Sequence, residues 1–195
     1  SAMEWEKYAE DNNLYRERAL GKIKTEKEII NKIVDIMPYN LTDNQKREIL
    51  NRRQERMKRA LLNVDNEILN TIKQLHYKDI KLGLISNSDI IDSKHWKESS
   101  LSEFFDVAVF SCDAGIMKPD TKIYETAMHM LSVSPKESIF VGDGGSDELY
   151  GAKIAGMRTV FTEYLERKPS DKIEKIKLYA DFHIDKFYEL LRCLE

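Results

Sequence analysis

The spacing of apolar residues changes near Asn63–Asp65. Before this point, apolar side chains recur every three or four residues, which is typical of amphipathic helices. One such stripe consists of Ile29, Ile30, Ile33, Val34 and Met37. After this point, short apolar runs of β type alternate with helical patterns. We therefore expect two parts, a small α-helical domain over residues 4–64 and an α/β domain over residues 65–195.

Three helices are predicted in the first part. Residues 4–20 form the first, with Gly21 as its stop. Thr25 begins the second, and Glu28 three residues later completes a capping-box arrangement. Thr42 can cap the third.

The third predicted helix carries a basic face made of Arg47, Arg52, Arg53, Arg56 and Arg59. Such a face could attract anionic substrates or nucleic acid. However, Glu48 and Glu55 dilute it, and no aromatic residue lies among the arginines. A formal net charge of −3 gives no support for nucleic acid either. We interpret these arginines as a solvated helix face and expect no nucleic-acid partner.

The second part alternates predicted strands with predicted helices. The strands are expected at 80–85, 107–110, 138–141, 159–161 and 182–184. The helices are expected at 65–75, 92–105, 120–131, 147–155 and 187–194. This alternation predicts a doubly wound, Rossmann-like parallel sheet. The active sites of such sheets lie at the carboxyl ends of the strands.

Composition agrees with an ordinary globular chain of 195 residues, of which 42% are hydrophobic and 33% are charged. The only cysteines, Cys112 and Cys193, are expected to be free, buried thiols in a cytoplasmic protein. No apolar run approaches the ~20 residues that a membrane-spanning helix needs, so we expect no membrane partner. The four histidines show no spacing typical of metal ligands.

Two carboxylates, Asp143 and Asp147, stand four residues apart where a predicted strand meets a helix. The glycines between them let the backbone turn tightly, and paired carboxylates suit Mg²⁺. The alternative is that Asp147 is only a helix cap and Asp143 only a turn residue.

Two further polar positions also follow predicted strands. Ser86 and Asn87 end the first strand, where a hydroxyl and nearby backbone N–H groups can hold a phosphate oxygen. Lys118 precedes Pro119 just ahead of a helix, where it could neutralise a phosphate or a carboxylate. Taken singly, Ser86 is as well explained by turn chemistry, and Lys118 by a solvated surface.

The order of these sites, a serine, a Lys-Pro pair and an acidic pair, resembles the haloacid dehalogenase superfamily. The segments LGLISNS, GIMKPD and FVGDGGSDELYGAKIAGM carry the resemblance, which points to the subgroup with an α-helical cap. It implies that Ser86, Lys118 and Asp143 are catalytic, that Ser86, Asn87 and Lys118 bind substrate, and that Asp143 and Asp147 hold Mg²⁺. It further implies hydrolysis of a small phosphorylated metabolite through an aspartyl-phosphate.

One feature of the superfamily has no match in this sequence. Its first motif, Asp-x-Asp-x-Thr after the first strand, supplies the attacking carboxylate, and the sequence contains no such motif. Asp11 and Asp35 lie in helical, polar surroundings and are no substitutes. We therefore expect this chain to be inactive alone.

The strand that carries this first motif is the central strand of the family's sheet. Its neighbours would be the strands that end at Ser86 and Asp143. Each buried unpaired backbone group costs roughly 1–3 kcal/mol, so we expect no empty position to persist. Either the two flanking strands pair directly, or another chain, including a second copy that exchanges a strand, or a further segment occupies the place.

Three functions remain open on the sequence alone. The first is a phosphatase whose nucleophile lies on a segment outside this sequence. The second is a natural remnant that binds phosphorylated ligands or proteins without turnover. The third is another activity of the superfamily, such as a phosphomutase or a dehalogenase, although a dehalogenase would not need the acidic pair.

Overall fold

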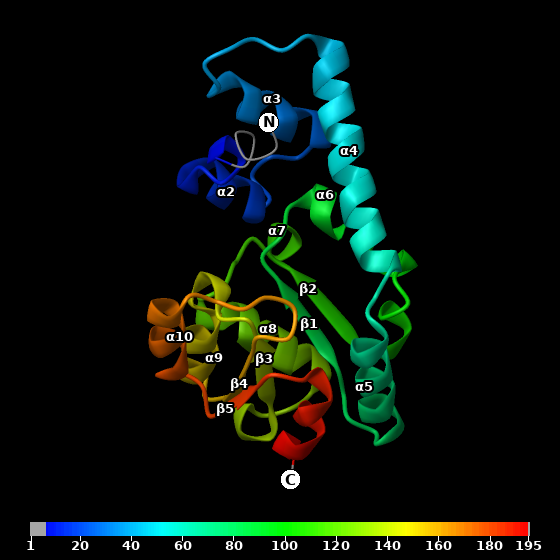
Figure 1. The fold of residues 1–195 in the computed structure, drawn as a ribbon, viewed down its shortest axis with the longest axis vertical. Coiled ribbons are helices and arrows are strands. Elements are labelled where there is room, and N and C mark those ends of the chain that lie inside the picture. Colours follow the sequence, from blue (N-terminus) through cyan, green and yellow to red (C-terminus); the bar gives the residue numbers. More distant parts are fainter. Residues whose placement is uncertain (1–6, 195) are drawn as a thin grey trace. The chain divides into compact units, whose positions relative to one another are not determined.

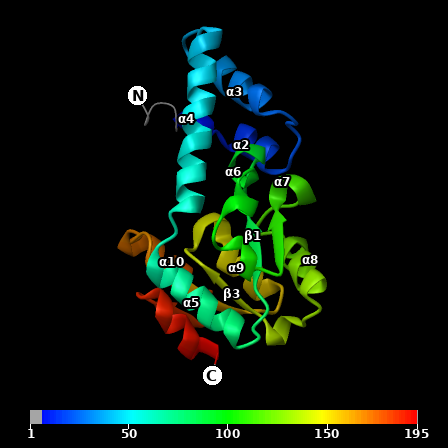
Figure 2. The ribbon, with the colours of Figure 1, turned by 90° about the vertical axis from the view of Figure 1, so that its right-hand side faces the viewer.

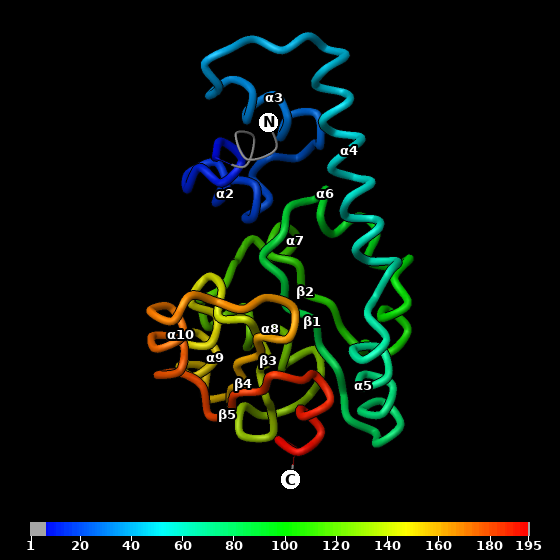
Figure 3. The backbone as a smooth tube through the Cα atoms, in the orientation of Figure 1, coloured from blue at the N-terminus to red at the C-terminus, as the bar shows by residue number. Residues whose placement is uncertain are grey.

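The computed structural model describes residues 7–194, and the chain separates into two compact units. The helical unit contains the chain up to Asn63 together with residues 87–99 and 110–117. The α/β unit contains residues 64–86, 100–109 and 118–195. The tube in Figure 3 shows how the chain passes repeatedly between the units. Each unit is described by itself.

The helical unit is built from α2 (Asn12–Ala19), α3 (Glu26–Asp35), α4 (Asp43–Leu62), α6 (Ile90–Ser93), the 3₁₀ turn η1 (Trp96–Glu98) and α7 (Ser111–Ala114) (Figure 1). The predicted caps are confirmed. The Thr25 hydroxyl accepts a hydrogen bond from the Glu28 amide, and Thr42 forms a capping box with Gln45. Gly21 adopts a positive φ of 64° where the first helical segment stops.

The apolar stripe of α3 forms the centre of this unit, since Ile29, Ile30 and Ile33 are at most 2% exposed. Leu14 and Ile91 pack against the same cluster. The unit therefore has its own core, to which α6 from the second predicted domain contributes.

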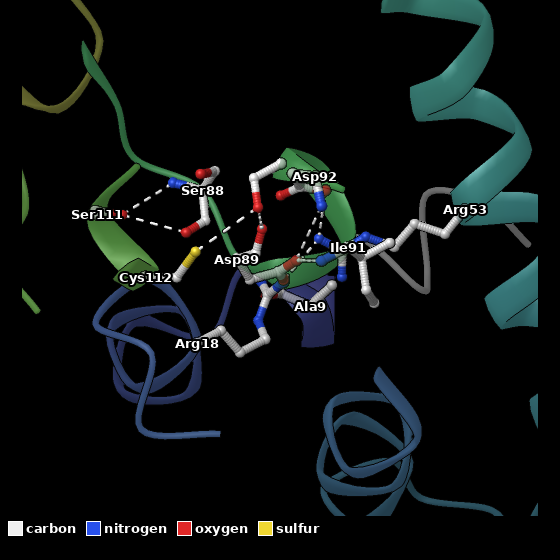
Figure 4. A network of polar contacts seen from close by, with 10 residues as sticks. Ala9, Arg18, Arg53, Ser88, Asp89, Ile91, Asp92, Ser111 and Cys112 are labelled. Atoms are coloured by element: carbon white, nitrogen blue, oxygen red, sulfur yellow. Dashed lines mark hydrogen bonds and ion pairs between the residues drawn. The ribbon is translucent and has the colours of Figure 1, made fainter. Parts of the chain in front are cut away.

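A buried network of charges joins three elements of the helical unit (Figure 4). Asp89 caps α6 and accepts hydrogen bonds from Arg18 of α2 at 2.6 Å and from Arg53 of α4 at 2.8 Å. Arg53 also contacts Asp92 at 2.8 Å. The interpretation of the α4 arginines as a solvated face is therefore wrong for Arg53, because two carboxylates on α6 draw its guanidinium inward.

The α/β unit follows the predicted alternation of strands and helices (Figures 1 and 2). Its strands are β1 (Gly83–Ser86), β2 (Val107–Phe110, with Phe110 assigned to the helical unit), β3 (Ile139–Gly142), β4 (Arg158–Thr162) and β5 (Phe182–Ile184). Its helices are α5 (Asn66–Tyr77), α8 (Thr121–Leu131), α9 (Glu148–Ile154) and α10 (Ser170–Lys177). The 3₁₀ segments are η2 (Ser102–Phe104), η3 (Pro135–Glu137), η4 (Gly145–Asp147) and η5 (Phe187–Leu194).

β3, β4 and β5 form a parallel sheet in that order. Val160 of β4 lies opposite Val141 on one side and Phe182 on the other. Successive residues of a strand point to opposite faces, so Val160 and Phe161 bury opposite faces of the sheet, both at 0% exposure. Val160 packs with α5 and η5, while α9 contacts β3 and β4. The doubly wound α/β fold is thus confirmed.

β1 and β2 form a separate two-stranded sheet. The amides of Asp106 and Val107 donate to the Leu82 carbonyl at the start of both strands, and α8 lies against β1 (Figure 2). Within residues 7–194, β1 and β3 are not paired with each other. The structure therefore contradicts direct pairing of the two strands, one of the alternatives that the sequence left open.

The predicted helix over 92–105 is wrong as a continuous element. In its place the chain forms α6, η1 and η2. The Asp89 side chain caps a helix that begins earlier, at Ile90, and the backbone is extended at Ser99. Serine competes for backbone hydrogen bonds and favours such breaks. The closing helix is a 3₁₀ segment, and α7 and α10 were not predicted.

Cys112 and Cys193 are free and buried, as predicted. Among the described residues, no helix combines the length and the apolar character that crossing a bilayer requires.

Candidate phosphate and metal site

Two of the predicted site residues lie where strands of the α/β unit end. Ser86 is the last residue of β1, and Asp143 directly follows β3. Lys118 lies in the loop before α8. Lys118 also lines one cavity of the unit together with Leu84 and Ile85 of β1 and Val141 of β3. Lys118 is thereby brought near the carboxyl ends of both strands, which is where doubly wound sheets place their ligands.

Asp143 is a half-exposed carboxylate held by two donors. One oxygen accepts from the Gly145 amide at 3.0 Å, and the other accepts from Lys168 at 2.9 Å. Burial raises the pKa of Asp143, but the hydrogen bonds from Lys168 and Gly145 outweigh it, so the pKa lies below its ordinary value. Asp143 is therefore ionised at neutral pH and can act as a metal ligand.

Glu148, the first residue of α9, is the partner of Lys118. Its carboxylate accepts from the Lys118 ammonium at 2.5 Å and from the Gly144 amide at 3.1 Å. Both side chains are shielded from water, with 12% of Lys118 and 7% of Glu148 exposed. A Cβ atom at position 142 would lie 2.1 Å from a Glu148 carboxylate oxygen. The glycine at 142 is thus required for Glu148 to reach the turn.

The two carboxylates of the turn interact. Burial raises the pKa of Glu148 and the charge of Asp143 raises it further, whereas Lys118 lowers it, and the net pKa lies above the ordinary value. Like charges at close range favour a counter-ion between them. Oxygen donors of this kind are the ligands that Mg²⁺ takes in proteins, so the residues present fit that ion.

Asp147, the other predicted metal ligand, is placed differently. It is exposed, its φ is 50°, and its side chain makes no capping hydrogen bond to α9. Glu148, in contrast, interacts electrostatically with Asp143. A role for Asp147 in metal binding stays a prediction.

Ser86 and Asn87 are partly buried neighbours in the chain. Ser86 belongs to the α/β unit and Asn87 to the helical unit. Their predicted contacts with a phosphate group likewise stay predictions.

Sequence reasoning missed Glu148 and Lys168. The signal for Glu148 was present, because it follows Asp147 directly and either carboxylate could have been the second of the pair. No sequence pattern indicates Lys168. It lies 25 residues beyond Asp143, and only the folded chain brings its ammonium into contact with that carboxylate.

The fold also groups His183 with Glu163 and Asp185, whose ligand atoms all lie within 4.8 Å of one another. Glu163 follows β4, and His183 lies in the neighbouring strand β5. The histidine ring accordingly contacts Glu163 at 2.9 Å and stacks on Phe161. Sequence spacing does not reveal this group, because it is formed by two paired strands.

Most of the chain, including the residues described above up to 162, matches a known protein family. Residues 12–162 match the family described as haloacid dehalogenase-like hydrolase. A glyceraldehyde 3-phosphate phosphatase of Pyrococcus furiosus is 34% identical over 128 residues, which is 64% of this chain and 52% of that protein. The chain thus spans about half the length of the curated relatives it matches.

Solved structures show the same fold. A phosphatase of this superfamily from Thermococcus onnurineus superposes with a TM-score of 0.62 and 25% identity, over 92% of this chain and 77% of that one. A family enzyme from Bacteroides thetaiotaomicron, solved with magnesium and inorganic phosphate, gives 0.64 with 17% identity, over 85% of this chain and 86% of that one.

Proposed function

The chain belongs to the haloacid dehalogenase-like hydrolase family, and we propose that it carries the phosphate- and metal-binding groups of a phosphohydrolase. The substrate class that we propose is a small phosphorylated metabolite. Relatives named as phosphatases of a three-carbon phosphate support this class. The cytoplasm remains the expected location.

The observation that carries the proposal is the connected set Lys118, Glu148, Gly144 and Asp143. A buried ammonium contacts a buried carboxylate, which in turn accepts from the backbone of the turn that follows Asp143. Charge-assisted hydrogen bonds of this kind fix a side chain in one geometry. Lys118 is thereby held ready to donate to a phosphate oxygen, with the Ser86 hydroxyl as a further donor at the end of β1.

Mg²⁺ is the proposed cofactor, with Asp143 as its principal ligand and Glu148 beside it. When bound, the ion would neutralise phosphate oxygens and the two carboxylates. Asp143 is half-exposed. The oxygen that accepts from Lys168 could therefore bind a cation in place of that ammonium, with no change in the buried core. Asp147 would contribute less, because it is exposed and has no contact that aims it at this turn.

The attacking carboxylate is not among the proposed roles. Covalent phosphoryl transfer needs a nucleophile, and the sequence has no Asp-x-Asp-x-Thr motif. Lys118, Ser86 and Asp143 would bind and orient a phosphate but not attack it. We therefore propose that this chain alone binds phosphate without turnover, and that a phosphatase activity requires a carboxylate from another segment.

A second candidate function, a non-catalytic phospholigand-binding protein, rests on that same missing motif. A dehalogenase is less well supported, because the acidic groups around Asp143 would have no metal to hold. Phosphate binding is common to the first two functions, so it is the property to measure first.

Isothermal titration calorimetry with inorganic phosphate in the presence of Mg²⁺ tests the proposal. The Lys118→Met variant should bind phosphate at least about tenfold more weakly, since a charged donor contributes about 1.5–3 kcal/mol. Lys136→Met is the matched control, because Lys136 is exposed in η3 of the same unit. Equal phosphate affinity in the wild type and both variants would contradict the assignment of Lys118.

A further inference from the structure

A histidine and two carboxylates meet at the ends of the paired strands β4 and β5 (Figure 1). Glu163 directly follows β4, His183 is the middle residue of β5, and Asp185 directly follows that strand. The parallel register places His183 opposite Phe161, two residues before Glu163. The pairing of the two strands thus gathers the three side chains, and one ligand atom of each lies within 4.8 Å of the other two.

His183 and Glu163 are held in place by their surroundings. The His183 ring stacks on Phe161, with the ring centroids 4.8 Å apart and 18° between the ring planes. The Glu163 side chain is only 9% exposed, and its Oε1 accepts a hydrogen bond from the Lys168 amide at 3.1 Å. Its Oε2 lies 2.9 Å from Nε2 of His183. Surrounding contacts of this kind orient the ligands of metal sites in proteins.

Asp185 offers a third donor atom from the solvent side. Its Oδ1 lies 3.9 Å from Nε2 of His183, and its side chain is 75% exposed. Zn²⁺ bonds of about 2.0–2.2 Å would place two tetrahedral ligand atoms about 3.4 Å apart. Asp185 would therefore approach the histidine by about 0.5 Å, and the Glu163 oxygen would recede by about as much. An exposed side chain can make such an adjustment without any change in the core.

The donor atoms of this group select a class of cation. Both carboxylates converge on the same ring nitrogen, Nε2 of His183. A protonated Nε2 carries a single N–H and can donate it to only one carboxylate at a time, whereas a metal ion in place of that proton can contact all three groups. Mg²⁺ and Ca²⁺ take oxygen ligands. An imidazole nitrogen with carboxylates suits Zn²⁺ and similar transition-metal ions instead.

From this geometry we propose that His183, Glu163 and Asp185 bind Zn²⁺ or a chemically similar divalent transition-metal ion. The ion connects the end of β4 to the end of β5, and water completes a four-coordinate shell. Lys168 contacts both this group and the candidate phosphate site, since its amide donates to Glu163 and its ammonium donates to Asp143. The two sites share no proposed ligand, so the inference stands apart from the proposed function.

Isothermal titration calorimetry of the whole chain with Zn²⁺ tests the proposal. An excess of Mg²⁺ in the buffer competes for the oxygen ligands at Asp143, so the titration reports a site with a nitrogen ligand. We expect His183→Gln to bind Zn²⁺ at least about tenfold more weakly than the wild type, because a direct ligand is lost. His129→Gln is the matched control, since His129 is exposed in α8, and it should leave the affinity unchanged.

A second variant and a second measurement separate loss of a ligand from loss of folding. Asp185→Asn alters an exposed side chain and should also weaken Zn²⁺ binding, whereas Asp171→Asn, exposed in α10, should not. In NMR spectra, Zn²⁺ should shift the ring signals of His183 and leave those of His129 in place. Three results would overturn the proposal: no Zn²⁺ binding by the wild type, an affinity that either ligand variant leaves unchanged, or His183 ring signals that do not move at saturating Zn²⁺.

Discussion

At the scale of single residues, the site depends on how two neighbouring carboxylates are oriented. Glu148 is buried against Lys118 and the Gly144 amide, while Asp147 is exposed in a left-handed conformation. The sequence places both within reach of the same turn. The glycine at 142 leaves the space that the Glu148 carboxylate occupies, since a Cβ atom there would collide with it.

The first prediction follows from this orientation. Mg²⁺ affinity, measured by titration calorimetry, should fall about tenfold or more in Asp143→Asn, because a charged ligand is lost. Glu148→Gln should also weaken binding, and by more than Asp147→Asn does. Asp171→Asn, at an exposed position in α10, serves as the control. Mg²⁺ binding that survives Asp143→Asn unchanged would rule out the assignment.

The second prediction concerns pH and Asp181. Burial raises the pKa of Asp181, but hydrogen bonds from Lys153 and from the Thr159 amide, at 2.9 Å, outweigh it, so the pKa is lowered. A lowered pKa in the folded state stabilises the protein above the ordinary value of 3.8, and this stabilisation is lost as pH falls through the folded-state pKa.

Asp181→Asn should therefore reduce the free energy of unfolding by roughly 1–2 kcal/mol at pH 7. The difference from the wild type should shrink between pH 5 and pH 3. Urea denaturation at each pH measures it. A difference that stays constant across this range would show that the charge of Asp181 is not the cause.

At the scale of elements, the caps and strand patterns were predictable because they depend on neighbours in the sequence. Thr25 and Thr42 cap helices where expected. The helices expected from 65 and 120 begin one residue later, each capped by the aspartate at its start. The break between α6 and η2 was missed although local signals were present, because the Asp89 side chain caps a helix at Ile90 and Ser99 is extended. The contact of Arg53 with α6 depends on tertiary structure and leaves no local pattern.

The third prediction concerns this contact network. Arg18→Met should cost about 1.5–3 kcal/mol of stability, because Asp89, at 2% exposure, loses one of its two charged partners and keeps Arg53. Arg52→Met is the control, since the Arg52–Glu48 pair is exposed and such pairs contribute about 0.3–0.5 kcal/mol. Chemical denaturation followed by circular dichroism compares the two. A cost for Arg18→Met no larger than that of the control would contradict the network's role.

At the scale of the whole molecule, the doubly wound fold could be predicted from the sequence, but the pairing of its strands into two separate sheets could not. Periodicity identifies strands and their burial, whereas pairing depends on what lies beside each strand. The sequence left direct pairing of β1 and β3 open, and the fold separates them by a cavity. The same separation keeps Ser86 away from Asp143, whereas direct pairing of the two strands would have moved Ser86 towards it.

The central claim is that this chain has the groups that bind phosphate and lacks the group that attacks it. Steady-state hydrolysis of p-nitrophenyl phosphate with Mg²⁺ tests this claim most directly. The predicted result is release of p-nitrophenol no faster than in buffer, because no carboxylate nucleophile stands in a first motif. Substantial turnover that Asp143→Ala abolishes would contradict the claim, since another residue of this chain would then have to be the nucleophile.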